Sequence, residues 1–152
     1  MRESNFVTEL RRGLEKINIW SYKIPDAPYA SAAMRFAPEK PGDIIAMADG
    51  TGLLIECKQI KKWSAFGMKN LTRSQVRNLF LYQRAGGISL VALNVRIPGE
   101  FSRFLFFDFL AFQAKEKFSA KELRSLNFCV SQKFPVLSLE FWKDPEYVWG
   151  LG

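Results

Sequence analysis

The apolar residues at the start of the chain follow first a helical and then an extended pattern. From Phe6 to Ile17 they recur three and four positions apart, which predicts a helix over residues 3–17 with one apolar stripe. Residues 17–24 are rich in β-branched and aromatic side chains and predict a strand. Four prolines interrupt the next segment, so residues 25–41 are expected to form an exposed loop or a stalk-like projection.

The middle of the chain predicts a hairpin, a helix and a second pair of strands. Two apolar runs, residues 43–49 and 52–58, flank a glycine-rich turn, which predicts the hairpin. A helical pattern begins near Thr72 and ends at a pair of glycines. The nearly continuous apolar run of residues 88–96 predicts a buried strand, with residues 103–110 as its hairpin partner.

Short helices and an aromatic tail complete the predicted architecture. One helix is expected after Phe109, and Ser119 with Glu122 forms a capping box for another. No repeat or break in composition divides residues 1–152, so we expect a single domain. The predicted fold is α/β, with a central mixed β-sheet flanked by helices in the order α-β-β-β-α-β-β.

The composition favours a nucleic-acid partner and excludes histidine chemistry. The 22 lysines and arginines outnumber the 15 acids, and the formal charge of +7 favours a polyanion. A basic protein kept soluble by its charge is the alternative. Because the chain has no histidine, histidine triads and histidine zinc sites are excluded. Any chemistry must use carboxylates, lysines, hydroxyls or a bound metal.

Neither a disulfide framework nor a membrane span is expected. Cys57 and Cys129 are too few for such a framework or for a cysteine-rich zinc site. No apolar stretch is long enough to cross a bilayer, and the first residues lack the features of a secretory or transit peptide. We therefore expect an intracellular, cytoplasmic protein with reduced cysteines and no membrane partner.

The predicted hairpin gathers two acids and a lysine if its turn has two residues. With Gly50 and Thr51 in the turn, Asp43 lies opposite Lys58 and diagonal to Glu56, and the three side chains share one face. A three-residue turn would instead send Asp43 to the other face. The convergence of these charges therefore depends on the turn.

Two neighbouring carboxylates suit a hard divalent cation. Mg²⁺, which Mn²⁺ can replace, would bind Asp43 and Glu56, while Lys58 positions water or offsets charge on a phosphate. The alternative is a plain salt bridge at a strand end. Glu3 falls within the apolar stripe of the first helix, so it can supply a further ligand; alternatively, it belongs to a frayed first turn.

The order of these motifs resembles a nuclease superfamily. Pro41-Gly42-Asp43 and IECK at residues 55–58 resemble the motif of the PD-(D/E)xK superfamily. Residues 41–95, with an E-x-K strand, a lysine-rich segment, an Ala-Phe pair, a Lys-Asn pair and a glutamine-bearing helix, are similar to RecU-type and archaeal-type Holliday-junction resolvases. The resemblance implies a restriction-endonuclease-like core and a Mg²⁺-dependent endonuclease that resolves Holliday junctions or other branched DNA. A homodimer is expected, because two opposed strands must be cut symmetrically.

The resemblance also implies roles for the hairpin residues. Asp43 and Glu56 would bind the metal together with the main-chain carbonyl of Cys57, and Lys58 would be catalytic. These roles agree with those suggested by the clustered charges.

Three further implications concern the flanking segments. Glu3 would match the first-helix glutamate of the superfamily, with Glu9 as the alternative. Gln75 occupies the position of a helix glutamine that supports the site; a solvated helix residue is the alternative. Residues 25–41 fall where RecU-type enzymes project a stalk into the junction.

Basic residues follow the proposed acidic site closely. Those expected to hold the DNA backbone are Lys61, Lys62, Lys69, Arg73 and Arg77. Trp63 and Phe66 lie among them, and Phe66 is expected in the core instead of stacked on bases. Two other functions remain open: a related nuclease that cuts flaps, ends or duplex DNA, and a nucleic-acid-binding protein without cleavage.

Overall fold

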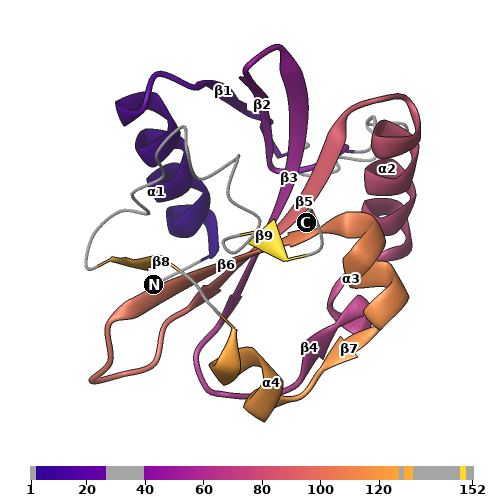
Figure 1. The fold of residues 1–152 in the computed structure, drawn as a ribbon. Coiled ribbons are helices and arrows are strands. Elements are labelled where there is room, and N and C mark those ends of the chain that lie inside the picture. Colours follow the sequence, from indigo (N-terminus) through magenta and orange to yellow (C-terminus); the bar gives the residue numbers. More distant parts are fainter. Residues whose placement is uncertain (1–2, 27–39, 127–128, 132–147, 150–152) are drawn as a thin grey trace, which may run out of the picture.

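The computed structural model describes residues 3–26, 40–126, 129–131 and 148–149. Within these residues the chain forms a central sheet, a small two-stranded sheet and helices on both faces of the central sheet (Figure 1). In chain order, the elements are α1 (Glu3–Lys16), β1 (Trp20–Lys23), β2 (Ile44–Ala48), β3 (Thr51–Ile60), β4 (Phe66–Gly67), the 3₁₀ helix η2 (Met68–Asn70), α2 (Arg73–Arg84), β5 (Ile88–Val95), β6 (Ser102–Asp108), α3 (Phe109–Lys115), β7 (Lys117–Phe118), α4 (Ala120–Ser125), β8 (Cys129–Ser131) and β9 (Val148–Trp149).

The central sheet is mixed, as predicted. In the described part of the chain it has seven strands in the order β1-β2-β3-β5-β6-β8, and β9 also pairs with β6. β3 and β5 are parallel, whereas β2 and β3 form an antiparallel hairpin and β5 and β6 another antiparallel pair. Parallel neighbours need a crossover connection, and α2 supplies it. β3 therefore lies inside the sheet, between β2 and β5.

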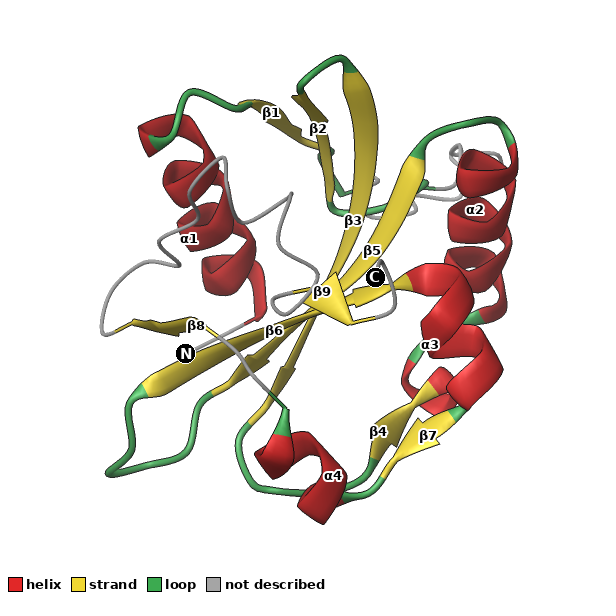
Figure 2. Cartoon of the chain, viewed as in Figure 1, coloured by secondary structure: helices red, strands yellow, loops and turns green. Residues whose placement is uncertain are grey.

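Helices cover the two faces of the central sheet (Figure 2). The apolar stripe of α1, which includes Phe6 and Leu10, packs on the face that we call the α1 face. α2 and α3 pack on the opposite face, the α2 face, where Leu79 is fully buried. Because side chains alternate along a strand, Ile55 of β3 belongs to the α1 face and Leu54 to the α2 face.

The turn between β2 and β3 has two residues, but it lies one position earlier than the predicted turn. Ala48 pairs with Thr51, so the turn residues are Asp49 and Gly50. Both have positive φ, 49° and 77°. That combination defines a type I′ turn, whose twist matches the flanking strands and for which Asp-Gly is a favoured sequence.

This shift corrects the predicted register without changing the faces. Ile44 pairs with Ile55, so Asp43, the residue before β2, lies beside Glu56 and not opposite Lys58. Moving a two-residue turn by one position changes the sum of paired residue numbers by two, and each side chain stays on its face.

The other predicted elements are confirmed, and the structure adds short elements that were not predicted, namely η2 and strands β4, β7, β8 and β9. Thr72 caps α2, and the capping box at Ser119 begins α4. The segment after β3 contains β4, which pairs with β7. A Cβ atom at Gly67 would collide with the carbonyl oxygen of Glu116, so this pairing needs glycine.

Most of the predicted projection and of the aromatic tail, residues 27–39 and 132–147, lies outside the described residues. Within the described part of the chain, no helix has the length and apolar character needed to cross a membrane. Cys57 is buried and forms no disulfide.

Candidate active site

β3 carries two of the three charged residues that the sequence singled out. Glu56 and Lys58 alternate with Ile55 and Cys57 of the α1 face, so both project from the α2 face. Only 4% of the Glu56 side chain is exposed, and Lys58 Nζ lies 4.0 Å from Glu56 Oε1. A carboxylate buried this deeply requires polar partners, because an unpaired buried charge is costly.

Asp43 is fixed beside Glu56 by its backbone and its side chain. Its N–H donates to the carbonyl oxygen of Ile55, and its own carbonyl oxygen accepts from the N–H of Ile24, each at 2.9 Å. Asp43 Oδ2 accepts a hydrogen bond from the N–H of Cys57 at 2.8 Å. The structure thus brings Asp43, Glu56 and Lys58 together on the α2 face.

A second lysine, which the sequence did not single out, completes this cluster. Lys40 Nζ lies 2.8 Å from Asp43 Oδ1 and 2.7 Å from Asp26 Oδ1. Burial acts to lower the pKa of Lys40, but its bonds to the two aspartates prevail and raise that pKa. The one signal in the sequence was the position of Lys40 three residues before Asp43, at the end of a segment without periodic pattern.

Gln75 connects α2 to the carboxylates. Its Nε2 donates a hydrogen bond to Glu56 Oε1 at 2.7 Å. Its Oε1 accepts from the N–H of Thr72 at 2.9 Å, and its own N–H donates to Thr72 Oγ1 at 3.2 Å, which completes the capping box. The start of α2 therefore fixes the orientation of the Glu56 carboxyl group.

The pKa of Glu56 shows how strongly this environment opposes a second negative charge. Burial, and next the charge of Asp43, raise the pKa of Glu56 to about 8, although Lys58 and Lys40 act in the opposite direction. A hydrogen bond between the two carboxyl groups contributes to the same shift. In the absence of a further cation, Glu56 therefore holds a proton near neutral pH.

The donors in this cluster fit a hard divalent cation. A cation placed between two adjacent carboxyl groups stabilises the state in which both are ionised, which these two groups otherwise oppose. Oxygen ligands suit Mg²⁺ or Mn²⁺. In the described residues no group of three acidic, cysteine or histidine side chains is arranged for a metal. A cation here would need other ligands besides Asp43 and Glu56, such as water, a main-chain carbonyl or phosphate oxygen.

The start of α1 is not brought to this cluster. Phe6 stacks on Phe104 of β6 with 5.7 Å between the ring centroids, so the first turn of α1 lies over β6, two strands from β3 in the sheet order. It also lies on the α1 face, whereas Glu56 projects from the other. A role for Glu3 remains a prediction from the resemblance. Glu9, the alternative, forms a salt bridge with Arg96.

Three of the predicted DNA-binding residues gather around the end of α3. Arg73 and Arg77 line a groove with Gln113 of α3. Lys69 and the same Gln113 line an adjoining cavity. Arg73 and Arg77 each lie about 200° around α2 from Gln75, so they point away from the carboxylates. All three basic side chains are exposed.

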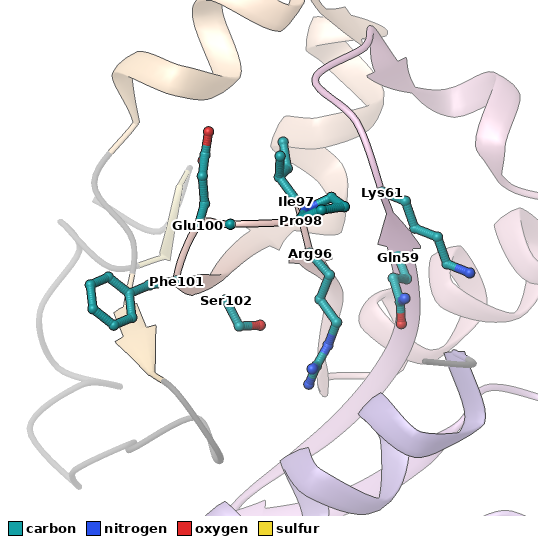
Figure 3. A pocket seen from close by; sticks show the side chains of 9 residues that line it. Gln59, Lys61, Arg96, Ile97, Pro98, Glu100, Phe101 and Ser102 are labelled. Atoms are coloured by element: carbon teal, nitrogen blue, oxygen red, sulfur yellow. The ribbon is translucent and has the colours of Figure 1, made fainter.

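The other two predicted DNA-binding residues lie elsewhere. Lys61 and Arg96 line a cavity of about 490 Å³ beside the β5–β6 loop (Figure 3). Because Arg96 pairs with Glu9 of α1, this cavity adjoins the α1 face. Lys62 is exposed next to Lys61. The five basic residues therefore form no single patch.

The aromatic residues of the basic segment have structural surroundings. Phe66 is 1% exposed, which confirms that it belongs to the core. Trp63 is close to two guanidinium groups: those of Arg103 and Arg124 are 5.4 and 5.2 Å from its ring centroid. Such cation–π contacts hold the indole in place.

The mixed sheet with helices on both faces is an α/β fold of the restriction-endonuclease-like resolvase type, which confirms the predicted fold class. No family model matches the sequence, and no curated protein does. Among solved structures, the chain is similar to Hjc, a Holliday junction resolvase from the archaeal hyperthermophile Archaeoglobus fulgidus. The match has a TM-score of 0.51 and 25% sequence identity, and it covers 71% of this chain and 78% of that chain.

Proposed function

We propose that this protein is a metal-dependent endonuclease that hydrolyses phosphodiester bonds in branched DNA, with the Holliday junction as the first candidate substrate. The observation that carries the proposal is the pair formed by Asp43 and the buried Glu56, fixed side by side with Lys58 on one face of the sheet. The similarity to Hjc favours a nuclease over other metal-dependent enzymes. The charge of +7 favours a nucleic-acid substrate.

In this proposal, Asp43, Glu56 and the carbonyl oxygen of Cys57 hold Mg²⁺, which Mn²⁺ can replace. When bound, the ion supplies Lewis acidity to the scissile phosphate and its attacking water. Lys58 orients that water or offsets the charge that develops on the phosphate. The Cys57 N–H keeps Asp43 in place, and the Gln75 amide does so for Glu56.

DNA binding is proposed to be electrostatic and to depend on shape more than on base sequence. The exposed Lys69, Arg73 and Arg77 would contact backbone phosphates near α3, and Lys61 and Lys62 would contact them beyond the end of β3. We expect two protomers to act together, since a four-way junction presents two equivalent strands.

The test is cleavage of a four-way junction whose arms cannot migrate, with Mg²⁺ present. Wild type should cut it, and Glu56→Ala and Lys58→Ala should not. Lys121→Met is the matched control, because this exposed lysine of α4 has no place in the proposed site. Equal cutting by all four proteins would overturn the catalytic assignment.

The same assay separates the remaining functions through its substrates. A flap and a linear duplex are offered beside the junction. Preference for the flap or the duplex would indicate a related nuclease with a different substrate. Binding to all three without cleavage would indicate a nucleic-acid-binding protein whose acidic cluster is structural.

A further inference from the structure

Lys40 places a positive charge on an oxygen that a metal would need. Its ammonium group lies 2.8 Å from Asp43 Oδ1, and only 22% of its side chain is exposed. The other oxygen of Asp43, Oδ2, already accepts the N–H of Cys57. Both carboxylate oxygens of Asp43 are therefore engaged.

A divalent cation and the Lys40 ammonium group cannot share Oδ1 without strong repulsion. Mg²⁺ binds carboxylate oxygens at about 2.1 Å, so an ammonium group on the same oxygen would be only a few ångströms from the ion. Lysine has a flexible four-carbon stem and can withdraw. Asp26 gives it a destination, since Lys40 already bonds Asp26 Oδ1 and 79% of that side chain is exposed.

We propose that Lys40 is the internal counter-cation of the metal-free site, which a divalent ion displaces from Asp43 towards Asp26. This inference rests on the proposed metal-dependent function, and it gives the site a residue that sets metal affinity without being a ligand. Lys40 keeps Asp43 and Glu56 together when no metal is bound, and it competes with the metal that replaces it.

The two partners of Lys40 give variants with opposite expected effects. Lys40→Met removes the competing charge, so Mg²⁺ should bind about 10-fold more tightly. Asp26→Asn removes the destination, so Lys40 stays on Asp43 and Mg²⁺ should bind several-fold more weakly. Lys121→Met changes the net charge by the same amount as Lys40→Met but should leave the affinity at the wild-type value.

The experiment is calorimetric titration of each full-length protein with Mg²⁺ alone, without DNA, at pH 8.5, where competition by protons is small. Circular dichroism first verifies that each variant is folded. If Lys40→Met does not fold, the weaker binding expected of Asp26→Asn carries the test. Failure of Lys40→Met to bind more tightly, or unchanged affinity in Asp26→Asn, would overturn the displacement of Lys40.

A different result would overturn the proposed function itself. If wild type and Glu56→Gln give the same titration without heat of binding, the carboxylates hold no metal, and the role of Lys40 falls with them. If wild type binds Mg²⁺ and Glu56→Gln does not, the metal site stands, and the affinities of the Lys40 and Asp26 variants decide the inference alone.

Discussion

The two faces of the sheet hold two charged clusters that differ in how completely they are neutralised. On the α1 face, Glu9 pairs with Arg96, whose Nε donates to Asn94 Oδ1 at 2.7 Å. The Asn94 amide in turn donates to Ser102 Oγ at 2.9 Å. In this cluster one acid, Glu9, is neutralised by one base, Arg96, and Arg96 is hydrogen-bonded to the fully buried side-chain amide of Asn94.

On the α2 face, two acids crowd each other instead. Asp43 and Glu56 are hydrogen-bonded to each other, Lys40 is shared with Asp26, and Lys58 lies 4.0 Å from Glu56. The first cluster joins a helix to the sheet, whereas the second opposes its own ionisation and gains from an added cation. Buried charge alone therefore does not indicate chemistry, but a pair of adjacent acids that opposes its own ionisation does.

The largest expected effect is on cleavage, and it separates the clusters by function. Asp43→Asn should lower kcat for junction cleavage by about 10³-fold, because a metal supplies several kcal/mol of transition-state stabilisation. Glu9→Gln, corrected for its folded fraction, should cleave at nearly the wild-type rate. Single-turnover kinetics measures both. A comparable loss in Glu9→Gln would show that Glu9 belongs to the active site, and the contrast would fail.

The next largest effect is on stability, and here the cluster on the α1 face should be the more sensitive of the two. Arg96→Met leaves Glu9 largely buried without its partner and should lower the free energy of unfolding by about 3 kcal/mol. Lys58→Met should lower it much less, because Lys58 is 4.0 Å from Glu56, beyond hydrogen-bonding distance. Urea denaturation of both variants without metal gives the comparison. Equal losses would mean that the two clusters are both structural.

The sequence predicted that Asp43, Glu56 and Lys58 share one face of the sheet, because this depends only on whether the turn has an even or an odd number of residues. The turn lies at Asp49-Gly50 and not at Gly50-Thr51, yet any two-residue turn at neighbouring positions keeps Asp43 and Glu56 on one face. The longer helices and strands could also be predicted from the sequence, since apolar periodicity reports burial directly.

The parts of the site that the sequence did not predict depend on long-range packing. Lys40 lies three residues before Asp43, but nothing local indicates that it also bonds Asp26, because a proline-rich segment without periodicity separates Lys40 from Asp26. The apolar stripe placed Glu3 correctly on a helix, but it could not say which strand lies beneath the first turn. Similarly, charge order along the chain did not reveal that the basic residues divide between two regions.

The pH dependence of stability sharpens the contrast in ionisation between the two clusters. The pKa of Glu56 is about 8 in the folded protein and near 4.5 when unfolded, so between these values the folded state binds more protons. The contribution of Glu56 to stability is present below about pH 4.5 and is lost as the pH rises through about 8. Urea denaturation in EDTA from pH 5 to 8 should show this decline in wild type and a flatter profile in Glu56→Gln. Parallel profiles would place the Glu56 pKa at its ordinary value.

The smallest expected effect tests whether Gln75 of α2 orients the Glu56 carboxyl group. Gln75→Leu removes the hydrogen bond to Glu56 and should lower kcat about 10-fold, as is typical when a residue that orients a metal ligand is lost. It also removes half of the capping box, so stability needs its own control. Thr72→Ala removes the cap at a cost of about 1 kcal/mol but leaves the Gln75 amide able to reach Glu56. If both variants lose stability but only Gln75→Leu has a lower kcat, Gln75 orients Glu56. If kcat falls equally in both variants, Gln75 acts only as part of the helix cap. In that case α2 has a purely structural role on the α2 face, as α1 has on the α1 face.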